Sequence, residues 1–389
     1  MTLQLLTIIT GLTLGVQAQS PIVQSQRHIA IELTKNVILA ECQQNAGGDW
    51  AKWHAQLKPY KQALRPVLDL AWQHPLISRT NPETKYPLIP FVKDQTRWIF
   101  ANNAFGSAIA SDDIKDYATR NRFVPIAKQI SSWLRSQDID LILLPVPTTL
   151  EIYPEGLVSD RSLVPRDLNT IPHVRMKFLE LLEQDVELVD LYPRLMKARK
   201  ESADLLYFRA DPHWNERAMR LAAIAVAERL TRYPWVKQAL KKPIAFAEVV
   251  TPHKEPEGWY EFFSDEVVNA MKPLMEGNFR NVVPGAKGLP EVLSPDSPVL
   301  VTGDSNIDSF YPPSGGLVGH IAKLINQPVS MQRIPGSLVA TFQDMFRDPN
   351  ILKGKKVVIW VIGAEQIEYD SPERSNFPDK FSIPPSKPK

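Results

Sequence analysis

The apolar positions of this chain follow two spacings that alternate along it. From residue 123 they recur three and four positions apart, the spacing of an amphipathic helix, and they then form a short continuous run, Ile139–Leu144. Pro145 and Pro147 follow this run and are expected to end it. The stretch therefore predicts a helix followed by a short buried strand.

The same order of helix and strand continues through the second half of the chain. Helices are predicted over residues 173–184, 215–232, 315–326 and 337–346, and strands over residues 186–191, 297–303, 328–333 and 355–363. Strands that are apolar throughout and alternate with helices indicate a parallel sheet that is covered on both faces. The predicted fold class is therefore α/β, with helices flanking both faces of a parallel sheet.

The two ends of the chain depart from this pattern. Leu3–Val16 is an apolar run that leads to small residues typical of a signal-peptidase site, so residues 1–18 are predicted to be a cleaved signal peptide. No Lys or Arg precedes the run, which leaves an uncleaved membrane anchor as the alternative, although a span needs roughly 20 apolar residues. Residues 19–369 are assigned to one domain, and residues 370–389, rich in Pro, Ser and Lys, to a disordered tail.

Composition and charge exclude several classes of function. With 389 residues, 44% of them hydrophobic and 23% charged, the chain can bury a large core. Its formal net charge is only +2 and its basic residues are spread along the sequence, which argues against a nucleic-acid partner. Cys42 is the single cysteine and no histidine pair has a metal-ligand spacing, so neither a metal site nor any other cofactor is expected.

One serine stands where a parallel sheet normally binds its ligands. Ser305 follows the predicted strand at 297–303, in the stretch "GDSNIDSF". Ligands gather at the carboxyl ends of parallel strands, so this serine is a candidate nucleophile. An ordinary turn is the alternative, because Gly, Asp and Ser are common in turns, and Asp304 is expected to shape this one.

A candidate base precedes the helix predicted from residue 215. Asp211 and His213 are two positions apart in "YFRADPHWNERA", so in an extended segment their side chains point the same way. The carboxylate could then fix the tautomer of the imidazole, which could activate Ser305 as in an Asp-His-Ser triad. The alternative is that Asp211 caps the helix, while His213 and Trp214 pack against it.

Both motifs together resemble a known family. The stretches "DLLYFRADPHWNERAMRLAA" and "SPVLVTGDSNIDSF" are similar to the Asp-x-His-Trp and Gly-Asp/Thr-Ser motifs of the SGNH hydrolase-like acetyltransferases of the alginate O-acetyltransferase AlgJ/AlgX type. The resemblance runs from about residue 87 to residue 367 and implies an SGNH hydrolase-like fold. It implies that Asp211 orients His213, that His213 activates Ser305, and that Trp214 packs beside the imidazole. It also places Arg333 on the oxyanion side of the site.

The resemblance implies a function and a set of partners. The implied enzyme is a periplasmic O-acetyltransferase that moves acetyl groups onto hydroxyls of an alginate-like exopolysaccharide through an acetyl-serine. A membrane-bound O-acyltransferase is the implied source of the acetyl group. Two alternatives stay open: a carbohydrate acetylesterase that uses the same triad, and a non-catalytic glycan-binding or scaffold component of an export complex.

Three other features have a structural interpretation. The aromatic stretch at residues 257–266 could stack on sugars but is more typical of core or lid packing. His320 lies in a predicted helix and is expected to be a packed, hydrogen-bonded histidine. Tyr153 is expected either to border the cleft or to pack in the core.

Overall fold

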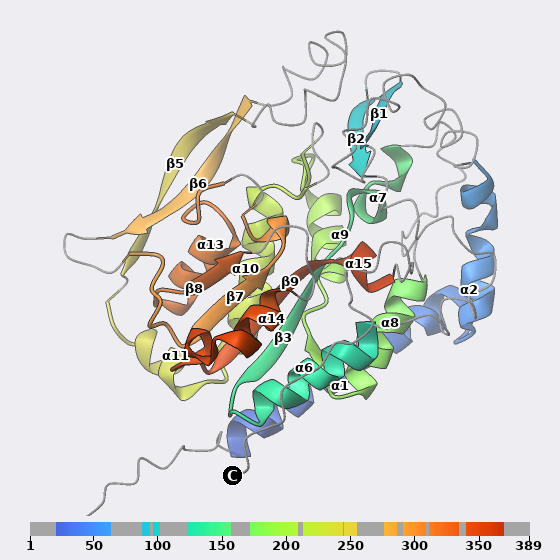
Figure 1. Cartoon of the computed structure of the whole chain (residues 1–389). Helices are drawn as coiled ribbons and strands as arrows, with labels where there is room; N and C mark the ends of the chain where they lie inside the picture. The colour runs from blue at the N-terminus through green and yellow to red at the C-terminus, as the bar shows by residue number, and fades with distance from the viewer. Residues whose placement is uncertain are drawn as a thin grey trace, which may run out of the picture.

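The core of the molecule is a five-stranded parallel sheet. The computed structural model describes residues 21–63, 88–93, 96–101, 123–156, 172–208, 213–243, 245–254, 276–285, 291–308, 311–333 and 340–368. The sheet has the strand order β4-β3-β9-β7-β8, of which β3, β9, β7 and β8 are labelled in Figure 1. Its strands are β3 (Asp140–Val146), β4 (Glu187–Leu188), β7 (Val299–Gly303), β8 (Ser330–Arg333) and β9 (Val357–Gly363).

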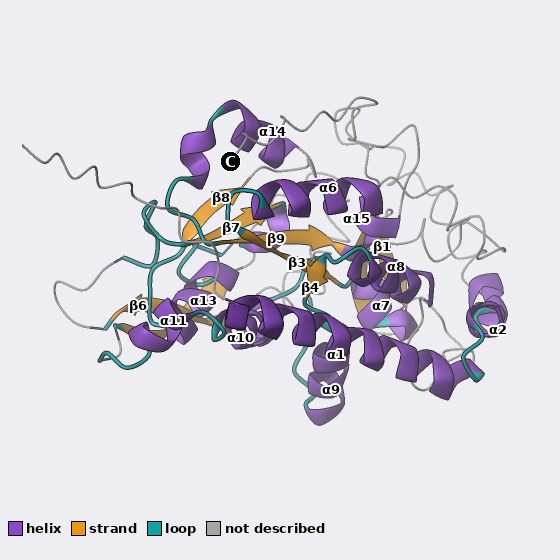
Figure 2. Ribbon diagram, turned by 90° about the horizontal axis from the view of Figure 1, so that it is seen from below, coloured by secondary structure: helices purple, strands orange, loops and turns teal. Residues whose placement is uncertain are grey.

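Side chains of the central strands alternate between two hydrophobic layers. In β3, Ile142 and Leu144 join one cluster of buried residues, whereas Leu141 and Leu143 join the other. Each fully buried aliphatic side chain contributes about 1.5–3 kcal/mol relative to an exposed one. Because both faces are apolar, helices cover both, as predicted (Figure 2).

The helices divide between these two faces. One layer contains α6 (Phe123–Arg135), α8 (Pro172–Glu183), α14 (Ala340–Arg347) and α15 (Ala364–Glu368). The other contains α9 (Tyr192–Glu201), α10 (Glu216–Leu230) and α13 (Leu317–Ile325). The predicted fold class, an α/β sheet flanked by helices on both faces, is therefore confirmed.

The first described helix packs along the edge of this assembly. Helix α1 (Pro21–Ala46) contacts α8 and β4, and the shorter α2 (Trp50–Gln56) folds back against it. Cys42 is buried beside Trp53 near the turn between the two helices, and burial raises the pKa of its thiol. Within the described residues, no helix has both the length and the apolar character required to cross a bilayer.

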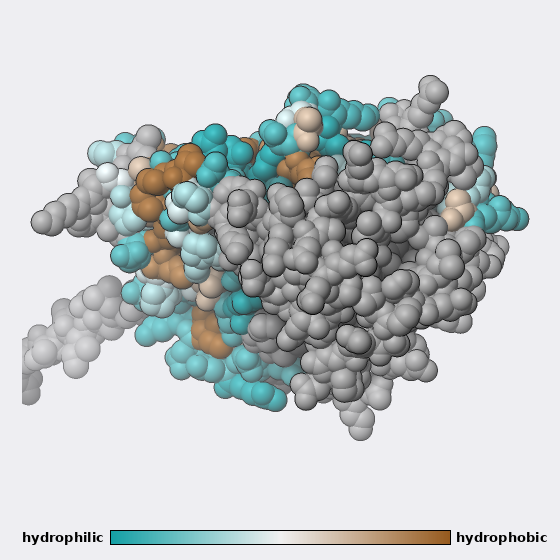
Figure 3. All heavy atoms as spheres, turned by 90° about the horizontal axis from the view of Figure 1, so that it is seen from above, coloured by the Kyte–Doolittle hydropathy of each residue, from teal (hydrophilic) through white to brown (hydrophobic). Residues whose placement is uncertain are grey.

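Several short elements were not predicted from the sequence. Two antiparallel hairpins, β1 (Leu88–Lys93) with β2 (Thr96–Ala101) and β5 (Phe246–Lys254) with β6 (Glu276–Pro284), lie outside the main sheet. Val249 and Val250 of β5 are exposed, and hydrophobic residues reach the surface on that side of the molecule (Figure 3). The remaining described helices are α7 (Thr149–Ile152) and α11 (Pro234–Ala239).

The predicted end of the first strand was wrong. Strand β3 continues through Pro145 to Val146, with Pro145 in register with Ile362 of β9. Proline lacks a backbone donor, which would normally break a strand inside a sheet. The backbone oxygen of Leu143 accepts from Val189 on the β4 side, so two residues later Pro145 faces the same side, beyond the end of β4. No strand faces Pro145 on that side, so its missing N–H removes no hydrogen bond from the sheet.

Four sequence predictions fall outside the described residues. They are the signal peptide at residues 1–18, Asp211, the aromatic stretch at residues 257–266, and the tail at residues 370–389. The assignment of residues 19–369 to one domain also stays a prediction.

Candidate active site

Ser305 begins a single 3-10 turn directly after the central strand β7. The strand ends at Gly303, Asp304 caps the turn, and the turn covers Ser305–Ile307. Gly303 has φ +147°, and a Cβ atom there would lie 1.9 Å from the backbone oxygen of Val361 in β9. Only glycine fits this close approach of two strands. The backbone thereby leaves the sheet abruptly and carries the serine to its carboxyl edge.

The buried carboxylate of Asp304 holds this turn in place. Its Oδ1 accepts from the backbone N–H and the side-chain amide of Asn306, both at 2.9 Å. Its Oδ2 accepts from the backbone of Gly363 at 3.3 Å and from the side chain of Gln366 at 2.7 Å. Asp304 therefore shapes the turn, as expected, and links it to the end of β9 and to α15.

A short backbone pairing fixes His213. The N–H of Phe208 donates to the backbone oxygen of His213 at 3.2 Å, and the N–H of Asn215 donates to that of Leu206 at 2.9 Å. The Asn215 side chain then accepts from the N–H of Ala218 and is the N-cap of α10. The N-cap position, which one alternative gave to Asp211, is therefore held by Asn215.

His213 and Ser305 meet although 92 positions separate them. Nε2 of the imidazole lies 2.7 Å from Oγ of the serine, within hydrogen-bond distance. The pairing leaves Nε2 correctly placed to accept the hydroxyl proton. Asp211, the predicted third member of the triad, lies outside the described residues.

Trp214 joins the two segments a second time. Its side chain is fully buried, and its Nε1–H donates to the backbone oxygen of Asn306 at 2.8 Å. The expectation that this tryptophan packs beside the imidazole stays a prediction. Its indole bonds the residue after Ser305, so residues adjacent to both candidate catalytic groups are joined.

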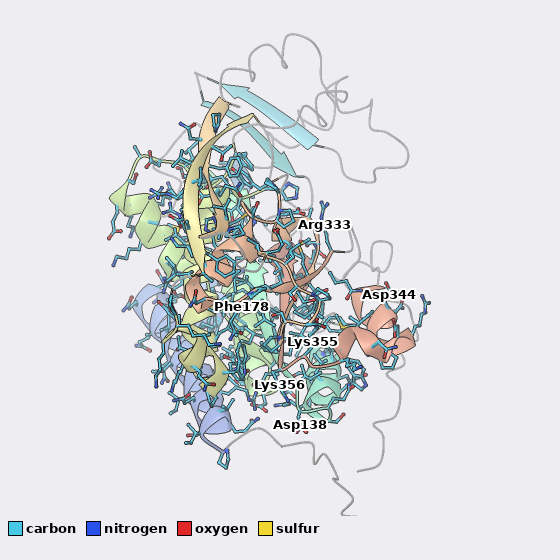
Figure 4. The ribbon with its side chains drawn as sticks, turned by 90° about the vertical axis from the view of Figure 1, so that its left-hand side faces the viewer. Asp138, Phe178, Arg333, Asp344, Lys355 and Lys356 are labelled. Carbon is cyan, nitrogen blue, oxygen red and sulfur yellow. The ribbon has the colours of Figure 1, made fainter. Side chains whose placement is uncertain are left out.

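Arg333 lies at the same edge of the sheet. It ends β8 in register with Gly303, two positions before the serine, and its side chain is 36% exposed. Its Nε lies 3.5 Å from Oδ1 of Asp308, which follows the serine turn. Figure 4 shows Arg333 far from Lys355, Lys356 and Asp138, which mark the opposite end of the central strands. The arginine is thus near the serine turn and has an acidic neighbour that the sequence did not indicate.

Further buried polar residues support the start of α10. The hydroxyl of Tyr311 accepts from the N–H of Glu216 at 3.3 Å. The carboxylate oxygen Oε1 of Glu216 lies 3.1 Å from Nε2 of His320 and 3.1 Å from Nε of Arg220. His320 is buried and packed in α13, as predicted, but its Nε2 makes no hydrogen bond to the described residues, although one was expected.

Tyr153 has a structural setting as well. Its buried hydroxyl accepts from the N–H of Leu206 at 3.0 Å, and its ring lies edge-on to that of Tyr207. The packed alternative for Tyr153 is therefore the correct one, and the contact supports the strand segment that precedes His213.

Two residues of the site had not been predicted as part of it, Gln366 and Asn306. A usable signal was present for Gln366, because it follows the carboxyl end of β9, and β9 neighbours β7 in the sheet. Among the described residues, no three His, Cys, Asp or Glu side chains cluster in a way that could hold a metal ion.

Comparisons with known proteins agree with this architecture. A family model described as the SGNH hydrolase-like domain of acetyltransferase AlgX matches residues 92–360. The O-acetyltransferase domain of Pseudomonas putida AlgJ has a similar structure, with a TM-score of 0.53 and 17% sequence identity over 71% of this chain and 91% of that one. At this identity the likeness shows the fold alone.

Two more distant structures also resemble this chain. Pseudomonas aeruginosa AlgX matches with a TM-score of 0.41 and 15% identity over 62% of this chain and 56% of that one. Bacillus cereus PatB1, solved with a sulfonyl adduct, matches with a TM-score of 0.42 and 11% identity over 74% of this chain and 97% of that one. No curated protein sequence matches this chain.

Proposed function

This chain belongs to the family of SGNH hydrolase-like acetyltransferase domains of the AlgX type, and we propose that it transfers acetyl groups to hydroxyls of an exopolysaccharide through an acetyl-serine. The observation that carries this proposal is the distance of 2.7 Å between Nε2 of His213 and Oγ of Ser305. A serine hydroxyl is a weak nucleophile on its own, so an adjacent base is the feature that acyl transfer requires.

The proposed first step acylates the serine. Oγ of Ser305 attacks the acetyl carbonyl while its proton moves to Nε2 of His213. The tetrahedral intermediate collapses, the bond to the donor's leaving group breaks, and the imidazolium returns the proton to that group. Asp211 is the proposed partner that orients the imidazole and stabilises its charged form.

The proposed second step transfers the acetyl group. A sugar hydroxyl gives its proton to His213 and attacks the acetyl-serine, and the proton then returns to Oγ as the ester bond to Ser305 breaks. The products are an O-acetylated sugar and free enzyme. The acceptor competes with water by its position, because a bound hydroxyl has a high effective concentration.

Arg333 is the proposed electrostatic support for the negative oxygen formed in both steps. Its place beside Gly303 and the partial exposure of its side chain favour this role. The carboxylate of Asp308, 3.5 Å from Nε of Arg333, would partly neutralise the guanidinium. The stabilisation of the negative oxygen by Arg333 would therefore come from the N–H groups that do not face Asp308. Loss of one oxyanion donor typically lowers kcat by about 100-fold or more.

The cellular setting is part of the proposal. Residues 1–18 would direct export, the acceptor would be a polysaccharide in the periplasm, and a membrane-bound O-acyltransferase would supply the acetyl group. Sequencing the N-terminus of the protein recovered from periplasm tests the first point, and a start near Gln19 is the expected result.

The reaction can be tested with a chromogenic acetyl ester as donor and oligosaccharides as acceptors. The wild type should release the leaving group and add one acetyl mass to the sugar, whereas Ser305→Ala and His213→Ala should do neither. Hydrolysis without any acetylated sugar, across several acceptors, would favour the esterase alternative. A folded protein that neither turns over the ester nor reacts with a sulfonyl fluoride at Ser305 would favour the scaffold alternative.

A further inference from the structure

A groove lies on the α10 side of the sheet, away from the candidate active site. It has a volume of about 710 Å³ and runs between α1, α9 and α10, which lie together in Figure 2. His213 precedes the first turn of α10, whereas the groove reaches Arg229 in its last turn, roughly 20 Å further along the helix. Its apolar lining comes from Leu33, Val37, Val189, Pro193, Ala198, Leu221 and Ala225.

An exposed apolar stripe on α1 extends this groove. Ile22, Ile29, Leu33 and Val37 are 66%, 52%, 59% and 45% exposed. Their spacing of seven, four and four residues places them along one side of the helix. The stripe is roughly 22 Å long, the length of about 15 helical residues. An apolar stripe of this length beside a groove is typical of a protein interaction surface.

Arg229 is a cation on the groove wall that makes no salt bridge to the described residues. Their carboxylates all lie beyond salt-bridge distance of it, and the one hydrogen bond of its side chain is to Oγ1 of Thr34 at 3.0 Å. Burial lowers the pKa of Arg229, and the more distant charges of Glu187, Glu228 and Asp190 offset this only in part. A guanidinium has five donors, so several remain for a ligand.

The other charges at the groove are already paired. Arg194 binds Glu228 at 2.7 Å, and Lys197 lies 3.8 Å from Glu201. Asp190 also lines the groove, but its carboxylate binds the buried guanidinium of Arg175 at 2.7 Å. The rim is therefore balanced, and among the described cations that line the groove Arg229 is the one without a salt bridge.

We propose that this groove and the α1 stripe bind an amphipathic helix of a partner protein, with an Asp or Glu of that helix paired to Arg229. A helix of four turns covers the stripe, and apolar side chains on one of its faces fill the space between α1, α9 and α10. A carboxylate on the same face forms a salt bridge with Arg229, since a bidentate pair satisfies two donors of the guanidinium. The balanced rim fits a protein better than an anionic lipid, because a lipid head group would call for several unpaired cations.

Site-specific photo-crosslinking in cells of the source organism tests this proposal on the full chain. p-Benzoylphenylalanine is placed at Val37 on the stripe and, as a matched control, at Leu39. Leu39 is equally exposed, at 45%, but lies roughly 120° around the helix from Leu33. The expected result is a protein adduct from position 37 and not from position 39, with the crosslinked segment an amphipathic helix that carries an Asp or Glu on its apolar face.

A charge exchange then tests the pairing. Arg229→Glu should lower the adduct yield at least about tenfold, and an acidic-to-Arg substitution in the partner helix should restore it. Thermal unfolding shows whether Arg229→Glu remains folded. If Arg229→Glu does not fold, Leu33→Asp replaces it, because this substitution changes an exposed side chain. The crosslinker is then placed at Ile29, and Leu33→Asp should abolish the adduct.

Four outcomes would overturn the proposal. They are an adduct with a second copy of this chain, an adduct with lipid, no adduct above that of the Leu39 control, and an adduct that Arg229→Glu leaves unchanged in the folded protein. Each is independent of acetyl transfer, which the ester assay measures separately.

Discussion

The indole N–H of Trp214 donates to the backbone oxygen of Asn306 at 2.8 Å, and this bond fixes the segment of His213 on the segment of Ser305. Trp214 follows the histidine and Asn306 follows the serine, so the contact lies one residue from each candidate catalytic group. The contact between Nε2 and Oγ alone would be a weak constraint, because both side chains can rotate. A bond between the neighbouring residues, with the indole of Trp214 buried, restricts that freedom and preorganises the pair.

Trp214→Phe tests this bond, because the substitution retains a large ring and removes the donor. Leaving the partly buried oxygen of Asn306 without this partner should lower the free energy of unfolding by about 1 kcal/mol or more. We also expect kcat for the acetyl ester to fall about tenfold or more, since small displacements of reacting groups are costly. Chemical denaturation and ester hydrolysis measure the two effects.

Trp235→Phe is the matched control, because this tryptophan stacks on Tyr233 far along the chain from the site. It should leave kcat unchanged. A Trp214→Phe variant with normal kcat would mean that the bond to Asn306 has no part in aligning His213 and Ser305.

Two aspartates in the same local motif allow a second comparison. Asp304 and Asp348 each cap a 3-10 turn and each accept from the N–H and the side-chain amide of the asparagine two positions later. Only Asp304 also accepts from Gly363 and Gln366. Asp304→Asn should therefore lower kcat at least about tenfold and the free energy of unfolding by about 1–3 kcal/mol, whereas Asp348→Asn, at an exposed turn, should cost less than about 1 kcal/mol.

The pH profile of kcat separates positioning from proton transfer in this comparison. Because Asp304 does not exchange a proton in the proposed steps, Asp304→Asn should lower the whole profile without shifting its inflections. Equal effects of the two substitutions on kcat would contradict a positioning role for Asp304.

The sequence was most informative where the period of its apolar residues was clear. The runs that became β3, β7 and β9 are buried on both faces, so their composition alone indicated a parallel sheet. The carboxyl ends of these strands then pointed to Ser305. The pairing of β5 with β6 has no comparable signal in the sequence. More than 20 residues separate the two strands, so no short turn motif marks them as a hairpin.

The contacts between distant segments were harder to predict. His213 was a candidate because of its neighbours, but its approach to Ser305 depends on the path of the chain between them. Asn306 carries no motif, and its role depends on where Asp304 lies, whereas the one signal for Gln366 was its position after the carboxyl end of β9. The strand was predicted to end at Pro145, but the effect of this proline depends on β4, which is too short to reach it.

Acid sensitivity provides a third prediction, at Asp185 in the turn between α8 and β4. Burial raises the pKa of its carboxyl, but the hydrogen bonds and charges of Arg27 and Arg135 outweigh burial and lower the pKa below 3.8. A lowered pKa means that this carboxylate stabilises the fold above its unfolded-state pKa and loses that contribution as pH falls through the folded-state value.

Asp185→Asn should therefore lower the free energy of unfolding at neutral pH. Below about pH 4 the free energy of unfolding should fall less steeply with pH in this variant than in the wild type. The residue has φ +60°, which asparagine tolerates, so the substitution tests the charge and not the turn. Urea unfolding between pH 3 and pH 7 measures the effect, which should be small because the carboxylate is partly exposed. Parallel stability curves for the two proteins would contradict the assignment.

Gly303 provides the last prediction, because it allows β7 to pass β9 just before the nucleophile turn. In Gly303→Ala the new Cβ would meet the backbone oxygen of Val361, and because that oxygen belongs to a central strand it can move only with the sheet. We expect the free energy of unfolding to fall by about 4 kcal/mol or more, in the range of severe core strain. Gly354→Ala is the control: it has φ +75° but nothing within 4 Å of the new Cβ, so it should cost only about 1–2 kcal/mol of backbone strain. Thermal and chemical unfolding compare the two variants. If Gly303→Ala is no less stable than Gly354→Ala and retains full activity, the close approach of β7 to β9 is not what places Ser305 beside His213.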